Sequence, residues 1–130
     1  MEESRPKILI VDDEPVICQL LESELGELNC ICKKALSGKD ALRILKGETF
    51  DLVLLDMKLP DMSGTYILEK IRKIHPDTPV IVITGVPDID MAVSAMKTGA
   101  SDYIVKPFDL NKLTTSVART IMNSKSRDTD

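Results

Sequence analysis

Short runs of hydrophobic residues recur along the chain and are rich in valine, isoleucine and leucine. Three strong runs span residues 8–11, 52–55 and 80–83, and two weaker ones span residues 30–35 and 103–105. The strong runs are too short for helices, and continuous hydrophobic runs of this length are typical of strands buried on both faces of a sheet. The pattern therefore predicts a sheet built from these segments.

The segments between these runs have the spacing of helices, with hydrophobic residues three and four positions apart. Ser37, Asp88 and Asp109 suit the N-cap positions of three helices. Gly47 and Gly99 suit the position just past a helix end. The spaced hydrophobic positions are Ile17, Leu20, Leu21 and Leu25; Ala41, Ile44 and Leu45; Ile67, Leu68, Ile71 and Ile74; Ala92, Ala95 and Met96; Leu110, Leu113, Val117 and Ile121.

The alternation of strands and helices predicts the fold class. Parallel strands need crossover connections, and these are right-handed, so helices come to cover both faces of the sheet. We predict an α/β domain with a doubly wound parallel sheet. In such sheets ligands bind at the carboxyl ends of the strands, where the strand order reverses, so function is expected there.

Composition narrows the function classes. At 130 residues, with 43% hydrophobic and 29% charged residues, the chain has the usual size of one compact domain. Aromatic residues make up only 3%, so the core must be aliphatic. The net charge of −4 argues against nucleic-acid binding by this segment, because such binding needs a surplus of lysine and arginine.

Cysteine usage and hydrophobicity bear on location. Cys18, Cys30 and Cys32 are odd in number and lack a zinc-binding spacing, so we interpret them as reduced thiols that act as small hydrophobic side chains. The first residues are polar and lack the hydrophobic core of a signal peptide. No hydrophobic run approaches the roughly 20 residues that span a bilayer. We therefore expect a cytoplasmic protein without a membrane segment.

Polar residues follow the predicted strands. In a parallel sheet they all lie at one edge. Carboxylates crowded together there repel one another and raise each other's pKa values unless a cation neutralises them. Mg²⁺ suits such a site, because it prefers oxygen ligands and takes one or two carboxylates. The polar residues are Asp12, Asp13 and Glu14 after the first strand, Asp56 after the third, Thr84 after the fourth and Lys106 after the fifth.

These residue types are suited to phosphoryl transfer. A carboxylate is a poor nucleophile, yet beside a metal ion it can attack phosphorus in line and form an acyl phosphate. Lys106 supplies a positive charge, and the Thr84 hydroxyl supplies a hydrogen-bond donor for a phosphoryl oxygen. Taken singly, an aspartate after a strand is equally well a helix N-cap, Thr84 a strand-end cap and Lys106 a solvated charge. Their convergence at one edge favours the chemical interpretation.

Five short motifs occur in order along the chain. They are Val-Asp-Asp-Glu at 11–14, Leu-Leu-Asp-Met-Lys-Leu-Pro-Asp-Met-Ser-Gly at 54–64, Ile-Thr-Gly at 83–85, Gly-Ala-Ser-Asp-Tyr at 99–103 and Lys-Pro-Phe at 106–108. In this order and spacing they resemble the motifs of response-regulator receiver domains of two-component signalling. The resemblance extends over nearly the whole chain. Each motif alone is weakly specific, whereas the complete set is very specific.

The resemblance implies a phosphorylation site and its metal ligands. Asp56 would be the phosphoacceptor. Asp13 would bind Mg²⁺ or Mn²⁺ directly, and Asp12 would act through water or alongside it. Asp56 itself and the backbone carbonyl of Lys58 would complete the protein ligands. Lys58 and Val86 occupy family positions that influence how fast water removes the phosphoryl group, and a bulky Val86 would slow that attack.

The resemblance also implies a switch. Lys106 would contact the phosphoryl group, and the Lys106–Pro107 peptide bond would be cis, which proline permits. Thr84 and Tyr103 would form the switch pair: the hydroxyl moves toward the phosphate and the aromatic ring turns inward. Without the resemblance, Tyr103 would be an ordinary edge-strand aromatic residue. The output surface would be the face that carries the fourth helix, the fifth strand and the fifth helix, through which a homodimer could form.

The fold and the domain limits follow from the same resemblance. The sheet would be flavodoxin-like, with five parallel strands in the order 2-1-3-4-5 and about five helices. Residues 7–123 would form the receiver domain, residues 1–6 an N-terminal tail and residues 124–130 a polar tail or linker stub. The segment at 84–113 is most similar to receivers that precede ATPase transcription-activator modules of the nitrogen-regulation type. The chain is therefore expected to be either a fragment of a larger regulator or a single-domain regulator.

The implied partner is a histidine kinase or a histidine phosphotransfer protein, which would donate the phosphoryl group. The domain would catalyse only its own phosphorylation and slow dephosphorylation, so it would not be an enzyme with turnover on an outside substrate. We expect no nucleic acid and no membrane to bind this domain itself.

Three rival interpretations fit the sequence less well. A phosphohydrolase of the haloacid-dehalogenase type needs a second carboxylate two residues after its nucleophile, where this chain has Lys58. A flavin- or mononucleotide-binding domain needs a glycine-rich or hydroxyl-rich phosphate loop, where this chain has Asp-Asp-Glu-Pro. A pseudo-receiver would share the fold without being phosphorylated, and the complete acidic set, Thr84 and Lys106 argue against it.

Overall fold

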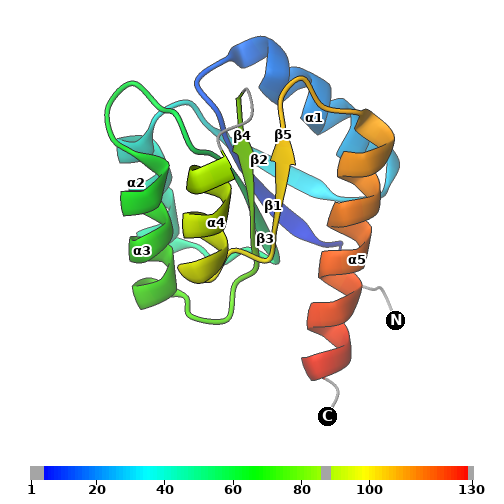
Figure 1. Ribbon diagram of the computed structural model, residues 1–130. Helices are drawn as coiled ribbons and strands as arrows, with labels where there is room; N and C mark the ends of the chain where they lie inside the picture. The colour runs from blue at the N-terminus through cyan, green and yellow to red at the C-terminus, as the bar shows by residue number, and fades with distance from the viewer. Residues whose placement is uncertain (1–4, 86–88, 129–130) are drawn as a thin grey trace.

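Strands and helices alternate along the chain (Figure 1). The structure, a computed structural model, describes residues 5–85 and 89–128, and Val86 and the predicted N-cap Asp88 lie outside them. The strands are β1 (Lys7–Val11), β2 (Ile31–Ala35), β3 (Leu52–Asp56), β4 (Val80–Thr84) and β5 (Asp102–Val105). The helices are α1 (Pro15–Glu27), α2 (Gly38–Gly47), α3 (Gly64–Ile74), α4 (Ile89–Lys97) and α5 (Leu110–Asp128).

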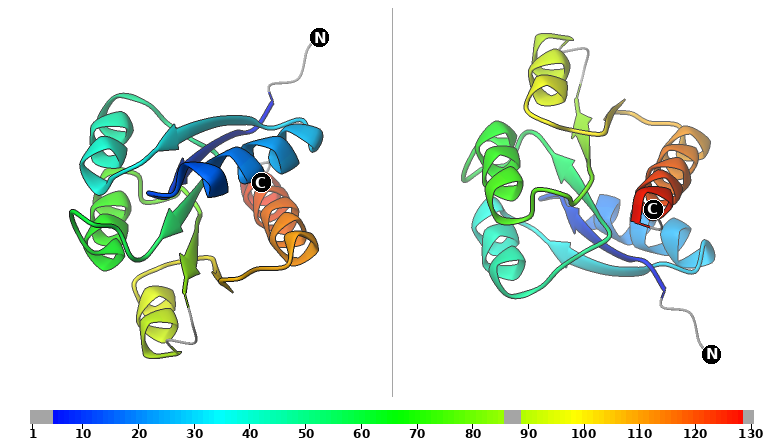
Figure 2. Two further views of the ribbon diagram at one scale, coloured as in Figure 1. Left: turned by 90° about the horizontal axis from the view of Figure 1, so that it is seen from above. Right: turned by 90° about the horizontal axis from the view of Figure 1, so that it is seen from below.

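The strands form one five-stranded parallel sheet in the order β2-β1-β3-β4-β5. Helices α2, α3 and α4 cover one face of the sheet, and α1 and α5 cover the other (Figure 2). The predicted fold class, the strand order and the number of helices are thereby confirmed. The chain changes direction across the sheet after β2, so the point at which the strand order reverses lies between β1 and β3.

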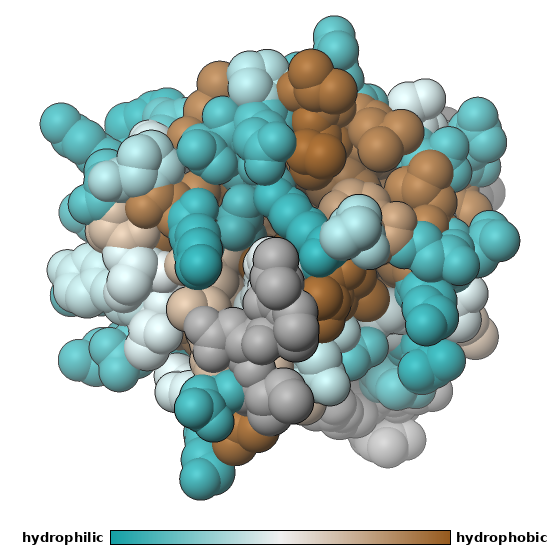
Figure 3. Space-filling model, turned by 45° about the horizontal axis from the view of Figure 1, so that its top comes forward, coloured by the Kyte–Doolittle hydropathy of each residue, from teal (hydrophilic) through white to brown (hydrophobic). Residues whose placement is uncertain are grey.

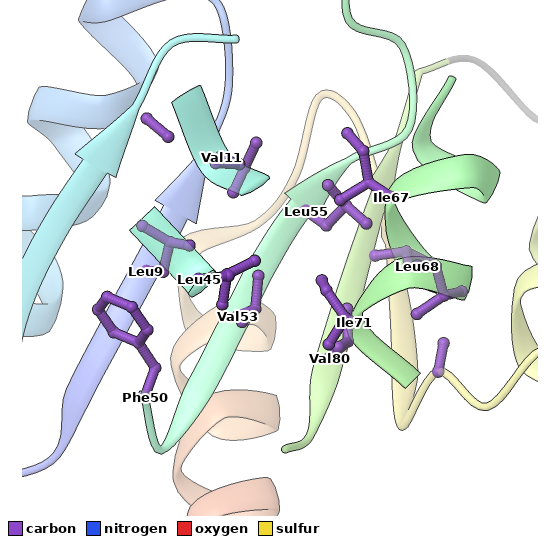
Figure 4. Close-up of a cluster of buried hydrophobic side chains, with 14 of the residues drawn as sticks. Leu9, Val11, Leu45, Phe50, Val53, Leu55, Ile67, Leu68, Ile71 and Val80 are labelled. Atoms are coloured by element: carbon purple, nitrogen blue, oxygen red, sulfur yellow. The ribbon is translucent and has the colours of Figure 1, made fainter. Parts of the chain in front are cut away.

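Each face of the sheet has its own hydrophobic core, because alternate residues of a strand point to opposite faces. Leu9, Leu55 and Ile67 belong to the core under α2 and α3 (Figure 4). Ile10 and Leu113 belong to the core under α1 and α5. The three inner strands β1, β3 and β4 are buried on both faces and therefore have continuous hydrophobic sequences, whereas the edge strands β2 and β5 do not.

The predicted helix ends are correct at three positions and wrong at one. The side chains of Ser37 and Asp109 each accept a backbone N–H, at the starts of α2 and α5. Gly99 has a φ of 109° just past α4, a left-handed conformation that favours glycine. The prediction for Gly47 is wrong, because α2 includes this residue and the chain leaves the helix in an extended conformation at Glu48.

Helix α5 is longer than the hydrophobic spacing indicates. Residues 124–130 are predicted to form a polar tail or linker stub, yet the backbone is helical as far as Asp128. A helix gains one hydrogen bond for each residue added, so it can continue beyond the part that packs against a core. Within the described range, no helix has both the length and the hydrophobicity to cross a membrane.

Gly64 provides a test of the packing at the end of β3. A Cβ atom at this position would lie 2.5 Å from the backbone Cα of Met57, which cannot move aside without shifting the chain. We expect Gly64→Ala to lower the free energy of unfolding, measured in urea, by about 1–3 kcal/mol, the usual effect of overpacking. The matched control is Gly26→Ala in α1, where a Cβ atom would meet no neighbouring element within 4 Å.

This control should raise the free energy of unfolding by about 0.5–1 kcal/mol, because alanine favours the helix over glycine. A Gly64→Ala protein as stable as the wild type would contradict the close contact between α3 and the end of β3.

Candidate functional site

The register of the strands brings the predicted polar residues together at the carboxyl edge of the sheet. Val11 pairs with Leu55, so Asp12 and Asp56, which follow them, are level on neighbouring strands. Asp56 in turn pairs with the residue before Thr84 on β4. Figure 3 shows the molecule with this edge tilted toward the reader, and hydrophilic side chains lie around its centre.

Four carboxylates form a cluster at this edge. Asp12, Asp13, Glu14 and Asp56 each offer one oxygen, and these oxygens all lie within 4.8 Å of one another. Asp12 is completely buried and Asp56 is 4% exposed, whereas Asp13 and Glu14 are exposed. The structure therefore unites the three predicted metal-binding aspartates. Glu14, which was expected at this edge but had no predicted role as a ligand, also belongs to the cluster. Its position directly after Asp13 is the sequence feature that indicates this.

The two buried aspartates are held in the same way. Asp12 Oδ1 accepts a hydrogen bond from the backbone N–H of Glu14 at 2.9 Å. Asp56 Oδ1 accepts one from the backbone N–H of Lys58, also at 2.9 Å. An aspartate that bonds the backbone two residues ahead turns the chain sharply at a strand end. One oxygen of each carboxylate is thus fixed by the backbone, and the other is left for the pocket.

Lys106 fills the space between these remaining oxygens. Its Nζ donates to Asp12 Oδ2 at 3.0 Å, to Asp56 Oδ2 at 3.0 Å and to Glu14 Oε2 at 3.2 Å. The side chain is only 18% exposed, so its contacts with the buried Asp12 and Asp56 are shielded from water more than a surface ion pair would be. Lys106 thereby links the end of β5 to the ends of β1 and β3.

Burial sets the protonation properties of this pocket. It raises the pKa of the Asp12 carboxyl above its usual value, against the hydrogen bonds from Glu14 N–H and Lys106, which lower it. Burial alone would lower the pKa of Lys106, but its bonds to Asp56 and Asp12 outweigh burial and raise it. Lys106 therefore remains an ammonium group, and its single positive charge is shared among Asp12, Glu14 and Asp56. Oxygen ligands in this condition suit a hard divalent cation.

Thr84 contributes a buried hydroxyl to the same edge. The residue is 1% exposed, and its Oγ1 has no hydrogen-bond partner among the described residues. Such an unpartnered polar atom is unusual in a folded protein, because burying a hydroxyl without a partner costs free energy. Tyr103, two residues before the β5 partner of Thr84, has an outward side chain that is 45% exposed.

Three further predicted positions are Pro107, Lys58 and Val86, and the structure describes the first two. The Lys106–Pro107 peptide bond is cis. The backbone of Lys58 lies beside the Asp56 carboxylate through the N–H bond described above. Val86, predicted to tune hydrolysis, lies outside the described residues. The described residues of the site lie at or just after the ends of β1, β3, β4 and β5.

Comparison with known proteins places the chain in a family. The family model for the response regulator receiver domain matches residues 8–118. The response regulator protein PilR of Pseudomonas aeruginosa is 47% identical over 115 residues, which cover 88% of this chain and 26% of that protein. The DNA-binding transcriptional regulator NtrC of Escherichia coli is 38% identical over 114 residues, which cover 88% of this chain and 24% of that protein. The chain thus spans about a quarter of the length of these relatives.

Solved structures agree with this assignment. A response regulator receiver domain protein from Methanospirillum hungatei superimposes with a TM-score of 0.91 at 31% identity, covering 95% of this chain and 99% of that one. NtrX from Brucella abortus superimposes with a TM-score of 0.90 at 34% identity, covering 96% of this chain and 28% of that one. With its acidic pocket and Lys106 in place, the chain belongs to the response regulator receiver domain family.

Proposed function

We propose that this chain is the phosphoacceptor domain of a two-component phosphorelay and that Asp56 receives the phosphoryl group. The observation that carries the proposal is the setting of the Asp56 carboxylate. One oxygen is fixed by the N–H of Lys58, and the other lies 3.0 Å from the Lys106 ammonium within the acidic cluster. Fixed geometry and nearby positive charge are what phosphoryl transfer requires of a protein.

The proposed reaction moves one phosphoryl group. A carboxylate oxygen of Asp56 attacks phosphorus and forms an acyl phosphate, while the bond from phosphorus to the imidazole nitrogen of a donor histidine breaks and its electrons stay on that nitrogen. The Lys106 ammonium, already hydrogen-bonded to Asp56, contacts the phosphoryl oxygens once they are attached. No general base is needed, because a carboxylate nucleophile has no proton to give up when it attacks.

A metal ion completes the proposal. Asp12, Asp13, Asp56 and the backbone carbonyl of Lys58 would hold Mg²⁺ or Mn²⁺, which would neutralise negative charge on the phosphoryl oxygens. The cluster suits such an ion: its four carboxylates lie within 4.8 Å of one another, and burial raises the pKa of Asp12. Among the described residues, Lys106 is the only cation that forms ion pairs with this cluster.

The donor is proposed to be a histidine kinase or a histidine phosphotransfer protein, as for the receiver family. Residues 58 and 86 are proposed to tune the later attack of water, and the bulk of Val86 to slow it. In this role the domain turns over no outside substrate.

The proposed switch uses Thr84 and Tyr103. Phosphorylation adds about two negative charges and new acceptor oxygens, and so favours the conformation that satisfies them. The unpartnered hydroxyl of Thr84 would turn to the phosphoryl group, and the exposed ring of Tyr103 would turn inward. A hollow of about 310 Å³ lies beside Tyr103. Most of the residues that line it are hydrophobic: Ala92, Val93 and Met96, together with Lys97.

This face, formed by α4, β5 and α5, is the proposed output surface and could support a homodimer. Val93, Met96 and Val105 are each more than a third exposed on it. NtrC, which this chain resembles over a quarter of its length, is named as a DNA-binding transcriptional regulator. We propose that this receiver likewise controls transcription, through parts of a longer protein rather than by binding DNA itself.

Phosphorylation can be tested by intact-mass measurement after incubation with acetyl phosphate and Mg²⁺. We expect the wild-type protein to gain the mass of one phosphoryl group and Asp56→Ala to gain none. EDTA added beforehand should abolish the gain. The matched control is Asp51→Ala, at the other end of β3, where the carboxylate accepts the N–H of Lys7, far from the acidic cluster. This variant should be phosphorylated like the wild type.

An unchanged mass for the wild-type protein would favour a pseudo-receiver that shares the fold without being phosphorylated. A gain that persists in Asp56→Ala would place the phosphoryl group on another residue and overturn the assignment of Asp56.

The unpartnered hydroxyl predicts an unusual effect of Thr84→Val on the unphosphorylated protein. Valine keeps the shape and removes a buried polar atom without a partner, so the free energy of unfolding should rise by about 1 kcal/mol. Ser116→Ala is the control, since the buried Ser116 hydroxyl donates to Asp102 at 2.5 Å. Its loss should lower the free energy of unfolding by about 1.5 kcal/mol. Destabilisation by Thr84→Val would mean that its hydroxyl is already satisfied before phosphorylation.

The proposed movement of Tyr103 can be followed by fluorescence. The chain has two tyrosines and no tryptophan, so Tyr66→Phe leaves Tyr103 as the single reporter. Phenylalanine also keeps a ring for the ammonium of Lys70, which lies 5.4 Å from the ring centre of Tyr66. We expect iodide to quench the fluorescence less after phosphorylation, because the ring turns inward. Adding Thr84→Val should remove this difference, whereas equal quenching in the phosphorylated and unphosphorylated protein would contradict the switch.

A further inference from the structure

The loop between Asp56 and α3 is fixed at both of its ends. At the start, the N–H of Lys58 binds the Asp56 carboxylate. At the end, the N–H of Gly64 donates to the carbonyl of Met57 at 3.0 Å, and Lys58 and Ser63 form an isolated antiparallel bridge. The loop is therefore a tight turn that begins and ends beside the phosphoacceptor. Its middle extends away from the sheet toward α2.

Asp61 anchors the middle of this loop to α2. Its Oδ1 accepts the backbone N–H of Gly38 and its Oδ2 accepts that of Lys39, both at 2.9 Å. These two N–H groups belong to the first turn of α2, which has no acceptor for them within the helix. The two bonds hold the pKa of the Asp61 carboxyl below its usual value, so the group is charged at neutral pH.

The contact is close as well as polar. A Cβ atom on Gly38 would lie 2.3 Å from Cγ of Met62 and 3.0 Å from Cδ1 of Ile67. A larger residue at position 38 would displace the Met62 side chain, so glycine lets the loop lie directly on the start of α2. That helix is itself fixed, because Ala41, Ile44 and Leu45 are buried in the core.

This contact does more than cap a helix. Ser37 already caps α2 by accepting the N–H of Asp40 at 3.1 Å. Asp61 lies 23 positions beyond Gly38 in the chain, so its bonds are a tertiary link between two elements rather than a local cap. The link ends three residues from Lys58, whose carbonyl is the proposed backbone ligand of the metal ion.

We propose that Asp61 is a positioning residue: by binding the start of α2, it holds the loop so that the backbone of Lys58 stays in place to bind the metal ion. The inference rests on the proposed function, since it concerns the same metal site. Without the link, residues 58–63 would be fixed only near Asp56 and Gly64. Ordering the loop would then oppose metal binding, because the loop would lose conformational freedom at that step.

The test compares Asp61→Ala with Asp51→Ala. Both changes remove an exposed aspartate that accepts backbone N–H groups, but Asp51 does so at the opposite edge of the sheet. The probe is Mg²⁺ alone, titrated at neutral pH while the backbone amide resonances of residues 56–59 and 61–63 are followed by NMR. We expect Asp61→Ala to weaken Mg²⁺ binding by about tenfold, a typical effect of losing an outer-shell partner of a metal ligand. Asp51→Ala should bind Mg²⁺ like the wild type.

A second variant keeps the test decisive if Asp61→Ala folds poorly. Asp61→Asn retains one oxygen acceptor, so its Mg²⁺ affinity should lie between those of the wild type and Asp61→Ala. Amide hydrogen exchange at Gly38 and Lys39 should become faster in both variants, which would verify that the link is lost.

Wild-type Mg²⁺ affinity in the Asp61 variants, together with faster exchange or lower stability, would reduce Asp61 to a helix cap and overturn the inference while leaving the proposed function intact. A wild-type protein that binds no Mg²⁺ would overturn both the metal site and this inference. The two failures are therefore distinguishable in one titration.

Discussion

The balance of charge at the carboxyl edge of the sheet is the constraint on which the rest of the site depends. Asp12 and Asp56 are almost wholly buried, and buried carboxylates persist only when they are paired and hydrogen-bonded. Each one accepts one backbone N–H and one bond from Lys106. The ammonium comes from the end of β5 and reaches carboxylates at the ends of β1 and β3. This one side chain therefore ties together strands that are not all neighbours in the sheet.

The same edge carries local instability that the two hydrophobic cores offset. Burial raises the pKa of Asp12, and the Thr84 hydroxyl has no partner among the described residues. A buried hydroxyl without a partner costs about 1–3 kcal/mol, whereas full burial of one large aliphatic side chain contributes about 1.5–3 kcal/mol. Leu9 and Ile10 are both completely buried, on opposite faces of β1 and close to the carboxyl end of that strand. The cores can thus support a buried polar pocket that would not be stable alone.

Sequence patterns predict the inner strands and the polar positions well, because both depend on local sequence. The strands β1, β3 and β4 are continuous hydrophobic runs, and their carboxyl ends carry the acidic residues and Thr84. Contacts between distant loops leave no such pattern. Asp61 lies in a polar loop, and the half-buried His75 has its Nε2 2.7 Å from the carbonyl of Leu45. The prediction that Gly47 lies just past the end of α2 was also wrong, because the sequence alone does not show which backbone φ a glycine adopts.

The charges in the pocket account for the metal requirement of the proposed reaction. Four carboxylates bring four negative charges, and among the described residues Lys106 alone opposes them through ion pairs. Phosphorylation of Asp56 would replace a single negative charge with about two. At separations near 4 Å, each like-charge pair is unfavourable by several kcal/mol in a partly shielded site. Lys106 cannot offset that increase, since its one positive charge is already shared among Asp12, Glu14 and Asp56. A divalent cation can offset it, and it can reach the cluster from solvent at the exposed Asp13.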